Sequence, residues 1–256
     1  MEYFKKLIRK LIKIILKFKI KRIKYKKLGS EYGSWAFDDT NIPNNFTLLS
    51  CGVGEDISFD IEILNNFTGK VYLVDPTPRA ITHYNNVKNK FGEKKIINYS
   101  KNGNQNVDSY DLRNISKDNL IFIDKAIHTR NTKLKFYKPK NSNFVSHSIF
   151  KNKNMSEDFI EVQALDMVEM IRGYNLKNID ILKLDIEGGE LQIIEDIFKK
   201  KIFPKQILFE FDQIKEGSIK SIFYLYKFFK LIKEFEYVYF YNDEKGNFSI
   251  KKITNR

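Results

Sequence analysis

The chain has 256 residues, of which 42% are hydrophobic and 30% are charged. This length fits one domain with a short appendage, and the apolar content excludes a wholly disordered chain. A single cysteine excludes a disulfide scaffold and is typical of the reducing cytoplasm, while three histidines disfavour a histidine-rich metal centre.

The net charge of +13 is concentrated at the amino terminus. Residues 1–27 hold twelve basic side chains and one acid, a net +11, which leaves +2 for residues 28–256. A protein that read nucleic acid would need a basic face on its body, so this distribution argues against a nucleic-acid partner. The sequence therefore predicts two parts, a basic appendage over 1–27 and a nearly neutral domain over 28–256.

The appendage has a helical pattern over residues 4–18. At 100° per residue one apolar stripe contains Phe4, Leu7, Ile8, Leu11, Ile14, Ile15 and Phe18, with lysines opposite. The pattern fails at Lys19 and Arg22, so residues 19–27 are interpreted as a basic linker. Such a helix can bind an anionic membrane surface, which predicts a cytoplasmic protein at the inner face of the membrane. The alternative is a helix docked on the body with solvated lysines.

Strands and helices alternate along residues 28–256. We expect strands at 46–50, 70–74, 120–123, 179–184, 206–211, 237–241 and 247–253, and helices at 57–64, from 76–79, at 165–171, 191–200 and 219–235. Short strands at 134–137 and 148–150 and a long loop at 98–118 complete the pattern. Alternation of this kind predicts an α/β fold with a mostly parallel sheet, helices on both faces and an antiparallel C-terminal hairpin.

Small and acidic residues follow the predicted strands. Gly52 and Gly54 form a turn after the first strand, where backbone N–H groups can approach a ligand. Asp75 ends the second strand, 21 residues after Gly54, and can accept hydrogen bonds from ribose hydroxyls. Ile57 stands where a nicotinamide fingerprint needs a third small residue, which favours S-adenosylmethionine (SAM). Asp185 ends the fourth strand, so all these residues are expected to line one crevice.

Four segments carry a family resemblance: SCGVGEDISFD (50–60), VYLVDPTPRAI (71–81), ALD (164–166) and IDILKLDIEGGELQII (179–194). Residues 30–215 resemble the FkbM family of SAM-dependent methyltransferases. The resemblance implies a class I methyltransferase (Rossmann-like) fold for 28–256, SAM as cofactor, and O-methylation of sugars or surface-glycan precursors. Ser50 replaces the acid usual two residues before the first glycine, and Asp56 replaces a small residue.

The resemblance also implies site residues. Gly52 and Gly54 would hold the methionine end of SAM, Asp75 the ribose, and 124–126 the adenine. The implied cofactor-binding set is Cys51, Gly52, Gly54, Glu55, Asp56, Asp75, Pro76, Asp124 and Ala126. Glu55 or Asp56 is a candidate for the missing carboxylate.

Transfer to an alcohol requires loss of a proton, so a base near the acceptor is expected. Asp185 is the first candidate, Glu187 the second, and His147 a third in the loop 143–148. No metal-ligand set is predicted, although Glu210 and Asp212 could join Asp185 around a divalent cation.

Structural interpretations stand beside the functional ones. Asp75 could cap a helix, Glu187 could pair with Lys183, Asp166 fits a helix N-cap, and Cys51 fits a small core residue. Tyr32 and Trp35 could cover the cofactor site. For the whole chain, the alternative to a methyltransferase is a non-catalytic membrane-associated module that keeps the fold. The sequence leaves the acceptor and the oligomeric state open.

Overall fold

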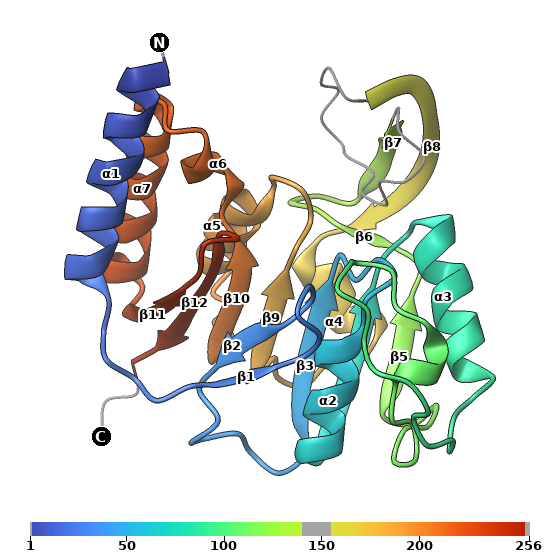
Figure 1. Cartoon of the computed structure of the whole chain (residues 1–256). Coiled ribbons are helices and arrows are strands. Elements are labelled where there is room, and N and C mark those ends of the chain that lie inside the picture. The colour runs from blue at the N-terminus through green and yellow to red at the C-terminus, as the bar shows by residue number, and fades with distance from the viewer. Residues whose placement is uncertain (1, 140–154, 254–256) are drawn as a thin grey trace.

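The computed structural model describes residues 2–139 and 155–253. Its main feature is a seven-stranded sheet in the order β11-β12-β10-β9-β3-β4-β5 (Figure 1). The strands are β3 (Phe46–Cys51), β4 (Gly69–Val74), β5 (Leu120–Ile123), β9 (Ile181–Leu184), β10 (Gln206–Glu210), β11 (Tyr237–Asn242) and β12 (Asn247–Lys252).

Five neighbouring strands of this sheet, from β10 to β5, are parallel. β12 pairs antiparallel with β10, and β11 antiparallel with β12. Numbered along the chain, the seven strands lie in the order 3-2-1-4-5-7-6. The order reverses between β3 and β9, which places a crevice beyond the carboxyl ends of these two strands.

Helices cover both faces of the sheet, each over its own apolar core (Figure 1). The helices are α2 (Ser58–Asn66), α3 (Pro78–Lys88), α4 (Met167–Gly173), α5 (Glu190–Lys199), the short α6 (Asp212–Lys215) and α7 (Ile219–Glu234). One core packs α2 and α3 against the sheet, and the other packs α4, α5 and α7. Alternate side chains serve the two cores: Leu48 belongs to the first and Leu49 to the second.

Two small sheets flank the main one. β1 (Lys26–Leu28) pairs antiparallel with β2 (Trp35–Phe37), and β2 lies against β10 and β12. β6 (Ala126–Ile127), β7 (Thr132–Pro139) and β8 (Met155–Leu165) form the other sheet, which follows β5 (Figure 1). The 3₁₀ turn η1 (Val107–Ser109) interrupts the long loop before β5.

The predicted fold class is confirmed, including the antiparallel terminal hairpin. Of the two short strands expected after β5, 134–137 lies within β7, and 148–150 falls outside the described residues. The sequence patterns missed β1, β2, β6 and β8. Asp166 is the N-cap of α4, accepting the Glu169 N–H at 2.8 Å, which confirms its structural interpretation.

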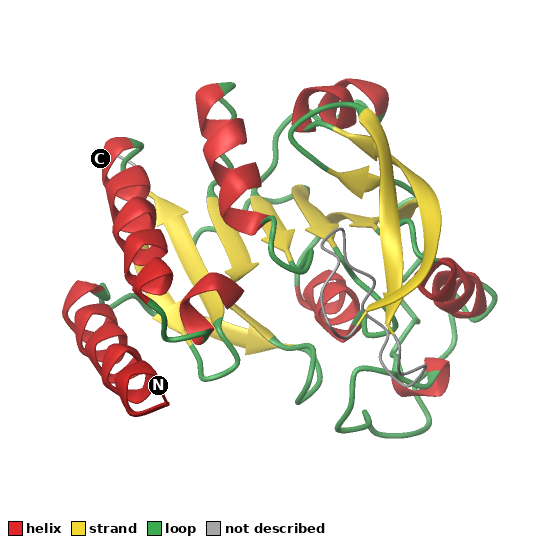
Figure 2. Ribbon diagram, turned by 90° about the horizontal axis from the view of Figure 1, so that it is seen from above, coloured by secondary structure: helices red, strands yellow, loops and turns green. Residues whose placement is uncertain are grey.

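The basic appendage contains the helix α1 (Glu2–Lys19), one residue or two longer at each end than predicted. It lies beside α7 in both views (Figures 1 and 2). Ile8, Ile12 and Leu16 are its buried side chains, and two of these, Ile12 and Leu16, lie beyond the predicted stripe. The linker is not free of the body either, since the Lys21 N–H donates to the Tyr239 carbonyl at 2.8 Å. Within 2–139 and 155–253, no helix combines the length and apolarity that a membrane crossing requires.

Candidate active site

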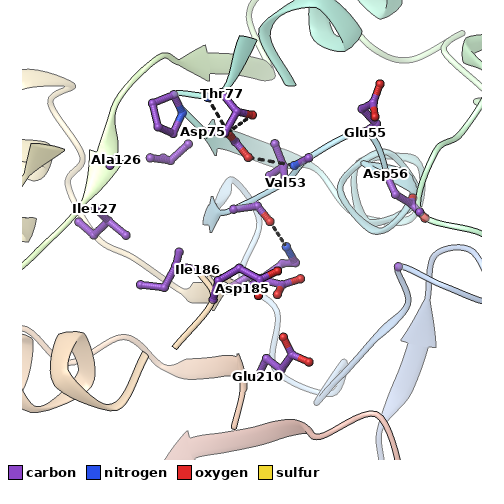
Figure 3. A pocket seen from close by; sticks show the side chains of 18 of the residues that line it. Val53, Glu55, Asp56, Asp75, Thr77, Ala126, Ile127, Asp185, Ile186 and Glu210 are labelled. Atoms are coloured by element: carbon purple, nitrogen blue, oxygen red, sulfur yellow. Dashed lines mark hydrogen bonds between the residues drawn. The ribbon is translucent and has the colours of Figure 1, made fainter. Parts of the chain in front are cut away.

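A cavity of about 540 Å³ opens at the carboxyl ends of β3, β4, β9 and β10 (Figure 3). This volume lies within the range of small-molecule and cofactor sites. Strand-end residues that are far apart in the sequence share its lining, among them Gly52, Asp75, Asp185 and Glu210. The crevice predicted at these strand ends is therefore present.

The glycine turn after β3 depends on the absence of side chains. Gly52 has φ +75°, and a Cβ there would lie 1.8 Å from the Asp185 carbonyl oxygen. Gly54 has φ +55°, and a Cβ there would meet no atom within 4 Å. The first glycine thus lets two strand ends approach each other, and the second leaves open space beside the backbone.

Asp75 connects the glycine turn to the end of β4. Its Oδ2 accepts the Gly54 N–H at 3.0 Å, and its Oδ1 accepts the Thr77 N–H and hydroxyl at 2.9 and 2.7 Å (Figure 3). The N-cap of α3 is Thr77, so the helix-capping alternative for Asp75 is wrong. The carboxylate lines the cavity, and its Oδ2, which accepts only one of these three bonds, can accept one more.

The acids after Gly54 are engaged with neighbouring loops. Asp56 accepts hydrogen bonds from the Ser30 hydroxyl, the Gln105 amide and the Ser58 N–H at 2.5, 3.1 and 3.0 Å. Glu55 pairs with Arg79 at 2.6 Å. Asp56 therefore joins two loops at the cavity. This gives a structural role to the residue that stands where the family pattern has a small one.

The segment after β9 forms a tight turn that carries Asp185 and Glu187 into the lining. Glu187 has φ +61°, a left-handed conformation that costs energy in a residue with a side chain. The buried Glu190 holds this turn, because its Oε1 accepts the Ile186 and Gly188 N–H groups, both at 3.0 Å. Gln213 adds a bond to the Gly188 carbonyl at 2.7 Å.

Two carboxyls of the site have raised pKa values. Burial raises the pKa of Asp185, Lys183 opposes this rise, and the charge of Glu187 adds to it. Burial and the neighbouring charge of Asp185 likewise raise the pKa of Glu210. Carboxyls displaced toward neutrality are suited to exchange a proton with a substrate.

Lys183 is a buried cation beneath these groups. Its ammonium donates to the Gly52 carbonyl at 3.3 Å and lies 5.2 Å from the centre of the Trp35 ring. Its positive charge lowers the pKa values of the Asp185 and Asp60 carboxyls and of the Cys51 thiol, against the effect of burial. It therefore compensates buried negative charge below the site.

The acids considered for a divalent cation are joined by a lysine. Lys215 forms ion pairs with both Glu210 and Asp212. In the part of the chain that the structure describes, no group of three or more His, Cys, Asp or Glu side chains could hold a metal ion.

Most of the predicted site residues share the cavity lining, namely Gly52, Gly54, Glu55, Asp56, Asp75, Pro76, Ala126, Asp185 and Glu187. Two cofactor-binding predictions lie elsewhere. Cys51 is fully buried in the core, and burial raises the pKa of its thiol to about 12, as its structural interpretation implies. Asp124 follows the end of β5, where its largely exposed side chain pairs with Lys125 at 3.0 Å. His147 falls outside the described residues.

Sequence patterns gave no role in the site to several residues that form it. Thr77 orients Asp75, Glu190 shapes the Asp185 turn, and Lys245 lies 5.6 Å from the centre of the Tyr32 ring at the rim. Tyr32 and Trp35, proposed as a cover, do line the cavity. Thr77 could have been found from its position two residues after Asp75, a spacing typical of Asx turns.

The strand order and the cavity at the switch point define a class I methyltransferase-type fold. The sequence model of the methyltransferase FkbM domain matches residues 41–240, and the chain belongs to this methyltransferase family. A solved structure described as methyltransferase FkbM from Methylobacillus flagellatus KT is similar, with 10% identity and a TM-score of 0.45. That alignment covers 81% of this chain and 43% of the other, so the chain spans less than half of that protein. No curated protein matches the sequence.

Proposed function

We propose that the protein transfers a methyl group from SAM to a hydroxyl of a sugar or surface-glycan precursor. One observation supports this most strongly: the glycine turn, Asp75 and Asp185 line a single cavity of cofactor size. Their convergence from three strands fits a nucleoside-bearing cofactor on one side and a proton-accepting carboxylate on the other.

The residues present fit SAM. The open space beside Gly54 suits close approach of a ligand to the backbone, and the Asp75 Oδ2 can accept a further hydrogen bond, from a ribose hydroxyl. Pro76 and Ala126 add apolar lining against which the adenine ring of SAM could pack. When bound, SAM would supply an electrophilic methyl group on its sulfonium.

Asp185 is proposed as the base. With SAM bound, the Asp185 carboxylate would accept the proton that the acceptor hydroxyl loses when its oxygen takes the methyl group. The Glu190-held turn fixes the position of this carboxylate, and Lys183 keeps it available in its ionised form. Alignment of the reacting groups and exclusion of water supply the rest of the rate enhancement.

The acceptor end of the cavity supports a polyhydroxylated substrate. Tyr32 lines the cavity together with Asp185 and Glu187. Burial raises the pKa of its phenol, and the charges of these two carboxylates raise it further. An aromatic ring beside several carboxylates can pack against the apolar face of a sugar while the carboxylates accept its hydroxyl protons.

Calorimetric titration of the full chain with SAM, and separately with NAD, tests the cofactor. We expect saturable SAM binding without NAD binding, and at least about tenfold weaker SAM binding in Asp75→Ala, which loses charge-assisted hydrogen bonds. Asp124→Ala removes a carboxylate outside the lining and is the matched control, with unchanged affinity. Absent SAM binding by the wild type would favour the non-catalytic module.

Turnover is tested with methyl-labelled SAM and a panel of nucleotide sugars. Asp185→Asn should bind SAM like the wild type and lose transfer by about 10²-fold or more, the usual contribution of a general base. Near-normal transfer by this variant would exclude Asp185 as the base while leaving the cofactor assignment intact.

A further inference from the structure

The helix α1 is fastened to the body along one edge. Ile8, Ile12 and Leu16 are four residues apart and bury one row of side chains in the core that includes α7. The Arg9 guanidinium donates to the Lys215 and Glu216 carbonyls, both at 3.2 Å. The segment is therefore a fixed part of the molecular surface.

A second apolar row of α1 points away from this contact. Phe4, Leu7, Leu11, Ile14 and Phe18 follow helical spacing, and their exposed fractions are between 45 and 83%. Single apolar side chains are common on protein surfaces, but a contiguous exposed row of this length is typical of an interaction site.

The neighbouring helix α7 extends this apolar surface. Ile219, Phe223 and Tyr226 are 63–70% exposed. The two helices run side by side in the same direction, because Gly217, just before α7, adjoins Lys5, and Lys19 lies 5.9 Å from the centre of the Phe229 ring (Figures 1 and 2). We call these eight side chains of α1 and α7 the outer apolar surface.

Positive charge accompanies the outer apolar surface. On α1 the exposed basic residues are Lys6, Arg9, Lys10, Lys13, Lys17 and Lys19, against the single acid Glu2. On α7 the exposed Lys220, Lys230 and Lys233 stand against Glu234. A second copy of the chain would bring the same uncompensated charge face to face with itself, which disfavours self-association here.

We propose that the outer apolar surface binds the interface of a membrane that contains anionic phospholipid. Its aromatic and aliphatic side chains would enter the boundary between headgroups and acyl chains, and the flanking lysines would contact lipid phosphates. Each basic residue near such a surface favours binding, and salt weakens that share. The docked edge and the membrane-binding edge are then different rows of one helix.

Co-sedimentation of the full chain with vesicles tests the proposal. We expect binding to phosphatidylcholine–phosphatidylglycerol vesicles, much less to phosphatidylcholine alone, and a decrease as salt rises. The double variant Leu7→Gln/Leu11→Gln should fold normally, because both side chains are exposed, and should bind at least about tenfold more weakly.

Matched controls separate this surface from general effects. Ile96→Gln removes an apolar side chain that is 75% exposed elsewhere and should leave binding unchanged. Lys10→Gln/Lys17→Gln should weaken binding about tenfold, whereas Lys101→Gln/Lys117→Gln, with the same loss of charge, should weaken it far less.

Three results would overturn the proposal: no vesicle binding, equal affinity for the two vesicle types, or unchanged binding of Leu7→Gln/Leu11→Gln. A wild-type dimer in light scattering that this double variant dissociates would also overturn it, since the surface would then join two copies. None of these measurements uses SAM or an acceptor, so they are independent of the proposed methyl transfer.

Discussion

Burial raises the pKa values of Asp185 and Glu210, the carboxyls at the ends of β9 and β10, and Asp185 is the proposed base. Below its raised pKa a carboxyl is protonated and does not accept the acceptor's proton. We therefore expect kcat to rise with pH between about 5 and about 8, instead of levelling near the ordinary carboxyl range. A pH profile of methyl transfer to whichever nucleotide sugar is accepted measures this.

Substitution of Lys183 tests whether the pH profile reports the pKa of Asp185. Its charge lowers the pKa of Asp185 against the effect of burial, so Lys183→Met should move the rising limb of the profile to higher pH. Lys183→Arg keeps the positive charge and should leave the limb in place. A wild-type profile without a rising limb, or a limb that Lys183→Met leaves in place, would contradict a carboxylate base at Asp185.

The turn between β3 and α2 shows how an element is constrained by two neighbouring glycines in different ways. A Cβ at Gly52 would overlap the Asp185 carbonyl, so Gly52→Ala should separate β3 from β9 and lower the melting temperature by many degrees. At Gly54 an added Cβ meets open space and costs only about 1–2 kcal/mol of backbone strain.

Thermal melting with and without SAM distinguishes these two variants. Gly54→Ala should stay folded and lose most of the stabilisation that SAM gives the wild type, because its new methyl group lies where a ligand would approach. Equal melting temperatures for Gly52→Ala and Gly54→Ala would refute the close approach of the two strand ends.

The elements that sequence patterns predicted are those with an unbroken local signal. The segments ending at Cys51, Val74 and Leu184 are short apolar runs followed by glycine or acid, which is typical of buried parallel strands. β1 and β2 have only three residues each, too few for any periodicity. β8 is long, but its residues 155–165 mix acidic and apolar side chains, and its register is set by β7.

The site residues likewise fall into those that the sequence predicts and those that it does not. Asp75 and Asp185 follow strands directly, so topology alone brings them together. Asp124 also follows a strand, yet the chain turns at once into β6 and its side chain remains at the surface beside Lys125. Lys183 acts through a tertiary contact with the Gly52 carbonyl, 131 residues away in the chain, which no local pattern encodes. Glu190 bonds to N–H groups only two and four residues before it, but its role depends on the tight turn that those residues form.

The free energy of unfolding of the whole molecule should depend on pH through the ionisation of Glu190. Burial raises the pKa of this carboxyl from 4.5 to about 7. Between these values the folded chain holds a proton that the unfolded chain has released, so the free energy of unfolding contributed by this group falls as pH rises. Glu190→Gln removes the titration while its amide oxygen can still accept the Ile186 and Gly188 N–H groups.

Urea unfolding of both proteins across this pH range checks the expectation. The stability of Glu190→Gln relative to wild type should increase by about 1–3 kcal/mol between about pH 5 and about pH 8. Glu244→Gln, which neutralises an exposed carboxyl in the terminal hairpin, should track the wild type instead. Because Asp60, Asp185 and Glu210 titrate in both proteins, their own contributions largely cancel in the difference, which then reports the Glu190 carboxyl and its effect on the pKa of Asp185. A difference that stays constant with pH would mean that Glu190 is ionised in the folded protein, and its turn would then be held by a carboxylate.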